Sequence, residues 1–197
     1  MARVHLLLAH PLPESFCAAI ADRAETALAA GGHEVDRLDL YQEGFDPRLT
    51  AAERHSYYHP PADLSAVASY VDRLQAADKV VLVFPQWWFN VPAILKGWFD
   101  RVFQPGVAFD HTPGYGQIEP RLDKLDSVLA VTTLGSPWWV AELVMRNPVR
   151  RQIKSGIVWA CARQARFRML NCYGTEKLSA AQREAFLGRV ERAARSL

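Results

Sequence analysis

Short apolar runs alternate with amphipathic stretches along the whole chain. Strands are predicted at 4–9, 80–84, 127–133 and 167–172, and residues 34–40 alternate apolar and polar side chains as a more exposed strand would. Helical spacing occupies 15–30, 64–76, 92–103, 138–163 and 179–197, with Pro148 and Gly156 as expected breaks in the fourth. The segments 41–62 and 104–124 are predicted to be long loops, and loops of that length are often functional.

Strands that alternate with helices predict an α/β fold. Five such strands imply a doubly wound parallel sheet with helices on both faces. Right-handed crossover connections leave few topologies for this pattern, and the strand order 2-1-3-4-5 is the one we expect. We found no repeat, low-complexity tract or second unit, so residues 1–197 are expected to form a single domain.

Composition narrows the classes of function. Half of the 197 residues are hydrophobic, which argues against disorder, and a net charge of +2 is too small to suggest a nucleic-acid partner. No run approaches the 18 or so apolar residues that cross a membrane. The cysteines Cys17, Cys161 and Cys172 lack metal-ligand spacing, so we expect reduced thiols in a cytoplasmic protein with no metal site.

The most informative stretch is 84–103, FPQWWFNVPAILKGWFDRVF. A buried strand ends at Pro85, a loop carries Trp87, Trp88 and Phe89 side by side, and a helix with Pro92 in its first turn follows. Ligands of open α/β sheets bind at the carboxyl ends of the strands. Three adjacent aromatic side chains at that edge therefore suggest a flat, apolar ligand.

The segment from His10 to Cys17 connects the first strand to the first helix. A helix N-terminus offers unpaired amides and the positive end of a dipole, which suits a phosphate, and Ser15 and His10 could add donors. Neither GxGxxG nor GxxxxGK[ST] occurs. The alternative is that Ser15 only caps the helix and that His10 is an ordinary loop histidine.

A second polar and aromatic loop follows the fourth strand. It contains Thr132, Thr133, Leu134 and Gly135, and then Trp138 and Trp139. In a doubly wound sheet this loop is a near neighbour of the Trp87 loop, and amides near Leu134 and Gly135 could bond the polar edge of a ring. The alternative is that the two tryptophans simply begin a packed helix.

Several other groups of side chains are weaker candidates for a functional site, because a structural role explains them as well. His55, Tyr57, Tyr58 and His59 resemble a metal or catalytic cluster, but no Cys or carboxylate set accompanies them and a lid is the favoured interpretation. Asp110 and His111 are either a catalytic dyad or part of a solvated loop. Lys96, Asp100 and Arg101 are expected to form an ion pair on the third helix. A loose basic group is either a solvated face or a site for an anion such as the extra phosphate of NADPH; it comprises Arg146, Arg150, Arg151, Lys154, Arg163, Arg166 and Arg168.

The segment 84–103 resembles the NAD(P)H:quinone oxidoreductases with a flavodoxin-like fold, including the modulator-of-drug-activity quinone reductases. HPLPESF at 10–16 is similar to the first flavin-phosphate loop of that family. Thr132, Thr133 and Gly135 are similar to its TTxG ring-binding loop, and Phe45-Asp46-Pro47 to a recurrent segment after its second strand. The resemblance covers most of residues 3–136 and is weak beyond them.

The resemblance implies a two-subunit flavoenzyme whose active site is completed by the second subunit. By that comparison Ser15, Phe16 and Cys17 would meet the flavin phosphates, although the family often has Asn in place of Cys17. The residues expected to border the isoalloxazine are Pro85, Gln86, Trp87, Trp88, Phe89, Thr132, Thr133 and Gly135. Arg183 would lie near an adenine phosphate. FAD is favoured over FMN because the relatives with the most similar motifs are FAD enzymes.

The sequence thus leads to one function and one alternative from another class. The first is a flavin-dependent NAD(P)H oxidoreductase that transfers two electrons to a quinone or similar small aromatic acceptor by a ping-pong mechanism. No catalytic side chain is assigned, because the flavin carries the chemistry and the Tyr–His pair of the mammalian-type enzymes is replaced by Pro137, Trp138 and Trp139. The acceptor pocket is expected to include Trp88, Trp138, Trp139, Tyr57 and Tyr58. The alternative is a non-catalytic flavoprotein, either an electron carrier or a regulatory subunit of a cation-efflux transporter.

Overall fold

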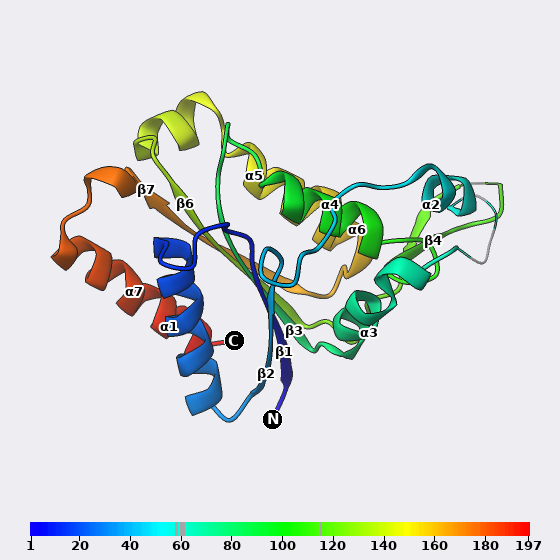
Figure 1. The fold of residues 1–197 in the computed structure, drawn as a ribbon, viewed down its shortest axis with the longest axis horizontal. Helices are drawn as coiled ribbons and strands as arrows, with labels where there is room; N and C mark the ends of the chain where they lie inside the picture. Colours follow the sequence, from blue (N-terminus) through cyan, green and yellow to red (C-terminus); the bar gives the residue numbers. More distant parts are fainter. Residues whose placement is uncertain (58, 60–61, 115) are drawn as a thin grey trace.

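Five parallel strands form the central sheet of the computed structural model, which describes residues 1–57, 59, 62–114 and 116–197 (Figure 1). Their spatial order is β2-β1-β3-β6-β7, which confirms the expected order 2-1-3-4-5 and the flavodoxin-like topology. Their bounds are Arg3–Leu8 for β1, Glu34–Asp39 for β2, Lys79–Pro85 for β3, Ser127–Leu134 for β6 and Arg166–Tyr173 for β7.

Burial explains which strands are central. Every residue of β3 and β6 is buried, because each strand has a neighbour on both sides and helices above and below. The edge strand β2 buries only its last two residues. The two central strands pair so that Pro85 lies opposite Thr133, and β1 and β3 pair so that Leu8 lies opposite Val83. The carboxyl ends of β1, β3 and β6 therefore meet at one edge.

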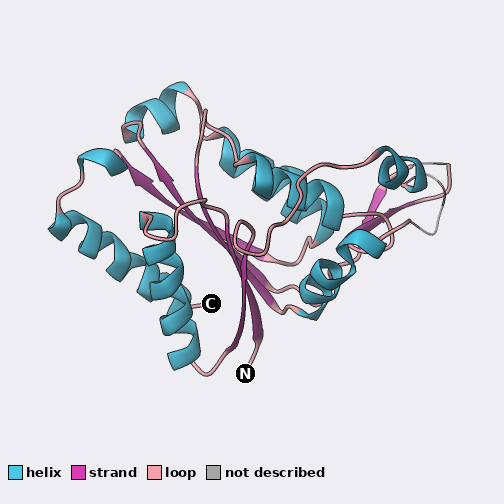
Figure 2. Ribbon diagram, viewed as in Figure 1, coloured by secondary structure: helices cyan, strands magenta, loops and turns pink. Residues whose placement is uncertain are grey.

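Helices cover both faces of the sheet (Figure 2). On one face lie α1 (Phe16–Ala30) and α7 (Ala180–Arg195), which contact each other and enclose a hydrophobic cluster with the sheet. The other face carries α3 (Ala68–Ala76), α4 (Ala93–Val102) and a continuous helical segment with its own cluster. That segment comprises α5 (Pro148–Arg151), the π-helical η3 (Gln152–Val158) and α6 (Trp159–Cys161).

Four expectations about local structure are wrong. The predicted loop 41–62 contains α2 (Ala51–Ser56), and the predicted loop 104–124 contains a hairpin of β4 (Phe109–His111) and β5 (Ile118–Pro120). Gly156 does not break its helix, because it lies inside η3, where the wider π-helical turn continues from Gln152 to Val158. Pro92 is the N-cap of α4 rather than a residue of its first turn, whereas Pro148 does interrupt the helical stretch as expected, since α5 begins there after the left-handed Asn147.

The segment from Pro47 to Glu53 is fixed against α4. Gly97 of α4 lies so close to the backbone of Pro47 that a Cβ at this position would collide with it. Arg101 forms a buried ion pair with Glu53, with an Nη2–Oε1 distance of 2.6 Å, and its Nη1 donates to the carbonyl of Asp46. The Thr50–Glu53 capping box at the start of α2 depends on the same carboxylate. Arg101 therefore stabilises the connection after β2, whereas Lys96 and Asp100 form the expected ion pair on α4.

The remaining short elements complete the chain. These are η1 (Ser65–Val67), the π-helical η2 (Val140–Val144) and η4 (Thr175–Lys177). Cys17, Cys161 and Cys172 are all buried free thiols, as expected. Among the described residues, no helix combines the length and the apolar character that a membrane span requires.

Candidate functional site

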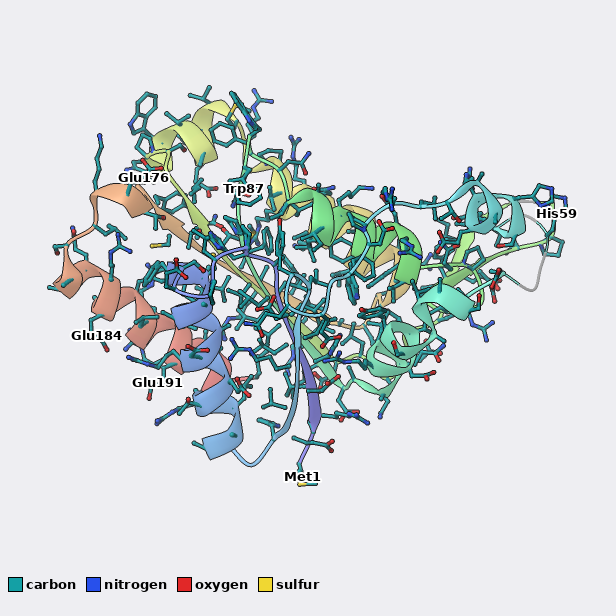
Figure 3. All side chains as sticks on the ribbon, in the orientation of Figure 1. Met1, His59, Trp87, Glu176, Glu184 and Glu191 are labelled. Carbon is teal, nitrogen blue, oxygen red and sulfur yellow. The ribbon has the colours of Figure 1, made fainter. Side chains whose placement is uncertain are left out.

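A cleft of about 350 Å³ lies where the carboxyl ends of β1, β3 and β6 meet. This volume is within the range that holds small ligands and cofactors. Figure 3 shows Trp87 and Glu176, two of the lining residues, near this edge of the sheet. The full lining is His10, Leu12, Ser15, Phe16, Cys17, Pro85, Gln86, Trp87, Thr133, Leu134, Gly135, Thr175 and Glu176. Three loops that are distant in the sequence are thus brought together as the sequence predicted.

The N-terminus of α1 opens into this cleft. Ser15 is the N-cap, and its Oγ accepts a hydrogen bond of 3.1 Å from the amide of Ala18, while its carbonyl accepts from Ala19. The first amides of a helix have no partner within the helix, so those of Phe16 and Cys17 are left for a ligand. Two free amides at the positive end of a 15-residue helix favour an anion such as a phosphate. Ser15 both caps the helix and lines the cleft.

His10 is held as a neutral hydrogen-bond donor at the end of β1. Its Nδ1 accepts a hydrogen bond of 3.1 Å from the amide of Leu12, so the ring proton of neutral His10 is on Nε2. Burial lowers the pKa of His10 below its usual 6.5. The ring also lies beside Trp87, with 6.2 Å between the centroids.

Cys17 is a buried, neutral thiol. Its Sγ lies 3.3 Å from Oγ1 of Thr133, which joins the helix N-terminus to the end of β6. Burial raises the pKa of Cys17 to about 11, so the thiolate is scarce at neutral pH. We therefore assign Cys17 a packing role and no role as a nucleophile.

The turn after β3 has unusual backbone geometry. The amide of Trp87 donates to the carbonyl of Asn90 and the amide of Asn90 donates back, while Trp88 and Phe89 have φ angles of 53° and 55°. Two left-handed residues in a two-residue turn normally require Asn or Gly, and bulky side chains are strained there. The side chain of Trp88 is 98% exposed, so it gains nothing from packing that would offset this strain. Strain of this kind is typical of functional sites.

Gly135 lines the cleft beside Glu176. A Cβ at this position would lie 3.2 Å from Oε1 of Glu176, so the exposed Glu176 side chain would have to shift by a few tenths of an ångström. Leu12, Thr175 and Glu176 also line the cleft, although they are not among the residues predicted from the sequence. Thr175 and Glu176 follow β7, whose carboxyl end reaches the same edge of the sheet, and that topology was the signal that could have identified them.

Several predicted site residues do not line this cleft. Thr132 is fully buried beneath it and bonds to Gln86 and Asn171. Trp88, Trp138 and Trp139 are exposed. Trp138 and Trp139 lead into η2, so the expectation that this pair begins a helix is correct, although the two side chains are not packed. Phe89 is half-buried in the strained turn. Tyr57 contacts Arg54 and Phe109 at the far end of the molecule, and Tyr58 lies outside the described residues.

The weaker candidates are dispersed. The Asp110 carboxylate pairs with Arg121 and accepts from the amide of Gly106, which is a structural role in the hairpin. The basic side chains do not converge, since Arg150 lies over Phe167, Arg163 over Trp159, and Arg168 bonds to Ser196. No set of three or more His, Cys, Asp or Glu side chains suited to a metal occurs in the described part of the chain.

Comparison with known proteins assigns the family. A family model described as Flavodoxin-like fold matches residues 2–191. The chain belongs to this family. Among solved structures of the same fold, Smu.1420 from Streptococcus mutans UA159 is 31% identical, with a TM-score of 0.85 over 99% of this chain and 100% of that one.

Two relatives carry names that describe an activity. The NAD(P)H:quinone oxidoreductase from Methanothermobacter marburgensis is 26% identical, with a TM-score of 0.85 over 98% of this chain and 96% of that chain. The ribosyldihydronicotinamide dehydrogenase [quinone] of Pongo abelii is 35% identical over 153 residues, or 68% of this chain. The match spans 64% of the length of that relative, so part of the longer protein has no counterpart in it.

Proposed function

We propose that this chain is a flavin-dependent NAD(P)H oxidoreductase that transfers two electrons to a quinone or similar small aromatic acceptor. The observation that carries the proposal is the cleft, which combines the free amides of α1 with the aromatic rings of Phe16 and of Trp87 after β3, and with the end of β6. A flavin has matching parts, namely a phosphate and a flat ring. The names of the relatives support the donor and acceptor classes.

The residues present fit a flavin. Ser15 and the amides of Phe16 and Cys17 would hold a phosphate. Pro85, Gln86, Trp87, Thr133, Leu134 and Gly135 would surround the ring. A bound flavin supplies hydride and two-electron chemistry, and the protein binds it, orients it and excludes water. No side chain of the cleft is required as a nucleophile, since the Cys17 thiol is neutral.

We favour FAD over FMN. The Arg183 guanidinium lies 5.2 Å from the Phe16 ring centroid, beside the helix N-terminus that would bind the first phosphate. Its Nη2 also donates to the carbonyl of Thr175, which fixes it at the border of the cleft. A second phosphate, present in FAD and absent from FMN, would find this cation nearby.

We also propose that residues 1–197 act as one domain and pair as a homodimer in the cytoplasm. Exposed apolar side chains gather on the segments that follow β3 and β6, namely Trp87, Trp88, Trp138, Trp139, Leu143, Val144 and Met145. A patch of this kind on a protein of this size usually meets a partner. His59, next to the Tyr57 segment, lies far from Trp87 in Figure 3, so that segment would complete the acceptor pocket only on a second copy. Light scattering should give about twice the chain mass of 22.1 kDa.

Reconstitution and anaerobic reduction test the function. Purified protein mixed with FAD or FMN should bind one flavin per chain, NADH or NADPH should bleach it, and a quinone should restore the colour. A single cleft used in turn by donor and acceptor predicts parallel double-reciprocal plots, as in a ping-pong mechanism. Failure to bind either flavin at micromolar concentration would reject the proposal. Binding without reduction by either nucleotide would instead support the non-catalytic alternative.

A further inference from the structure

A line of hydrogen bonds leads from the cleft to η2. Nε2 of Gln86 donates to Oγ1 of Thr132 at 2.8 Å and lies 3.4 Å from Oδ1 of Asn171. Thr132 donates to the same oxygen of Asn171 at 2.8 Å. Nδ2 of Asn171 donates to Oε1 of Glu142 at 3.1 Å and to the hydroxyl of Tyr173 at 2.9 Å. Thr132 belongs to β6, Asn171 and Tyr173 to β7 and Glu142 to η2, whereas Gln86 directly follows β3 and is the one that lines the cleft.

Glu142 determines the direction of every bond in this line. Its Oε1 also accepts from the Tyr173 hydroxyl at 2.5 Å and from Nδ2 of Asn147 at 2.8 Å. An ionised carboxylate only accepts, so Asn171 must turn its NH₂ group toward Glu142 and its carbonyl toward Thr132. That carbonyl in turn requires hydrogens from Thr132 and Gln86. The position of one charge in η2 thus fixes the orientation of an amide at the cleft.

The consequence is an unused acceptor oxygen on a residue that lines the cleft. Both hydrogens of Gln86 Nε2 are directed inward, which leaves Oε1. No hydrogen bond among the described residues uses Oε1, and it is not one of the side-chain atoms sealed from solvent without a partner. Gln86 itself is only 9% exposed. A buried amide with an unused acceptor at a cleft wall is completed by a ligand that brings a donor.

We propose that Gln86 Oε1 accepts a hydrogen bond from the bound flavin and that Glu142 is the positioning residue that holds this oxygen toward the cleft. The proposal rests on the proposed flavin site and adds a specific contact to it. Oxidised flavin offers two kinds of donor, the ring imide N3–H and the hydroxyls of the ribityl chain. Glu142 does not line the cleft, so it acts only through Thr132, Asn171 and Gln86.

A double-mutant cycle on flavin affinity tests the coupling. Gln86→Leu removes the acceptor and should weaken FMN and FAD binding about tenfold. Glu142→Gln lets the Asn171 and Gln86 amides turn over, and should weaken binding about threefold to tenfold in the unaltered background but less than about twofold in the Gln86→Leu background. Glu184→Gln, which removes the same charge on the far surface of α7, should leave affinity unchanged. Both Gln86 and Glu142 variants should also shift the long-wavelength absorption band of the flavin.

Two flavin analogues identify the donor. If N3–H is the partner, 3-methyl-FMN should bind the unaltered protein and Gln86→Leu with equal affinity, whereas lumiflavin, which lacks the ribityl chain, should still discriminate between them. If a ribityl hydroxyl is the partner, the two analogues should behave in the opposite way. Either pattern supports the proposal.

Two results would overturn the proposal. One is a Gln86→Leu variant that binds flavin as tightly as the unaltered protein. The other is a Glu142→Gln effect of equal size in both backgrounds, since that is what a merely structural role produces. Unaltered protein that binds no flavin would reject the proposed function itself, so the two failures are distinguishable.

Discussion

The two ends of the central strands differ sharply in how their polar groups are used. At the amino end, Lys79 forms an ion pair with Asp126 at 2.9 Å, and the Asp78 carboxylate accepts from the amide of Arg3 at 2.7 Å and pairs with Lys124. At the carboxyl end, the amides of α1 stay free, a strained turn holds Trp88 in solvent, and Gln86 keeps an unused acceptor. The polar groups named here are thus paired within the fold at one end of the strands and left without a partner at the other.

This contrast shows where stability and function reside. Ion pairs and hydrogen bonds within the fold stabilise the amino end of the strands, and the hydrogen bond from the amide of Arg3 lowers the pKa of Asp78. Groups at the carboxyl end cost stability until a ligand or a second subunit satisfies them, which is typical of binding sites. Changes at the amino end should therefore alter the free energy of unfolding and not flavin binding, whereas changes at the carboxyl end should alter the binding of flavin or acceptor.

Removal of the Lys79 ammonium should give the largest loss of stability among these tests. Lys79→Ala leaves Asp126 without its cation, and the side chain of Lys79 is only 6% exposed, so we expect unfolding to become easier by about 2 kcal/mol. Urea unfolding measures this cost. Lys96→Ala breaks an exposed pair on α4 and should cost less than about 0.5 kcal/mol. Flavin affinity of the folded protein should be unchanged in both, and a tenfold loss in Lys79→Ala would abolish the contrast between the two ends.

The N-caps of α1 and α7 offer a matched pair. Ser15 and Ser179 each accept from an amide in the first turn, at 3.1 Å and 3.3 Å, but only Ser15 lines the cleft. Either substitution by Ala should cost about 1 kcal/mol in urea unfolding. Ser15→Ala should also weaken FMN and FAD binding about fivefold, because it removes a donor beside the expected phosphate. Equal flavin affinities in the two variants would mean that Ser15 is a cap and nothing more.

Replacement of Trp88 should stabilise the fold while it impairs function. Trp88→Gly relieves a left-handed backbone at a side chain that packs against nothing in one subunit, so stability should rise by about 0.5–1 kcal/mol. The acceptor Michaelis constant should rise several-fold, because an aromatic contact is worth roughly 0.5–1.5 kcal/mol. Trp159→Ala is the matched control, because it removes another exposed tryptophan from a helix without backbone strain. A Trp88→Gly variant with lower stability and unaltered kinetics would show that the turn serves folding.

The smallest expected effect concerns His10 and pH. Burial lowers the pKa of His10, so the folded state resists the proton that the unfolded state takes up below about pH 6.5. Stability should therefore decrease slightly as the pH falls from about 7.5 to about 5.5, and this part of the decrease should be absent in His10→Ala. His33→Ala, beyond the carboxyl end of α1, is the control. An identical pH dependence in His10→Ala and the unaltered protein would argue against a neutral His10.

The sheet and the three loops of the cleft were predictable because their signals are local. The runs at 80–84 and 128–131 are fully apolar, and only a central strand buries such a run on both faces. α2 was missed because it is six residues long and buries only Glu53, although Thr50 and Glu53 form a capping box that was visible in the sequence. β4 and β5 have three residues each, too few for a periodic pattern.

The sequence could not predict which way individual side chains and turns point in the folded protein. Thr132 and Thr133 are neighbours, but successive side chains of a strand point to opposite faces, so one lies beneath the cleft and the other lines it. The left-handed turn at Trp88 has no sequence signal, because Trp and Phe are disfavoured there. The hydrogen bonds from Gln86 to Glu142 join four segments that are separate in the sequence, and only the folded chain shows that they meet.

The most direct test of the contrast between the two ends is hydrogen–deuterium exchange with and without bound flavin. Our account predicts slower exchange on addition of FAD or FMN at three segments, 10–18, 85–90 and 133–136, which form the carboxyl-end cleft. Amides at the amino end, around Asp78 and Asp126, should exchange at the same rate in both samples, because their partners are already within the fold. Flavin-dependent protection at the amino end, or none at the N-terminus of α1, would contradict the central claim that the carboxyl ends of β1, β3 and β6 form the binding site.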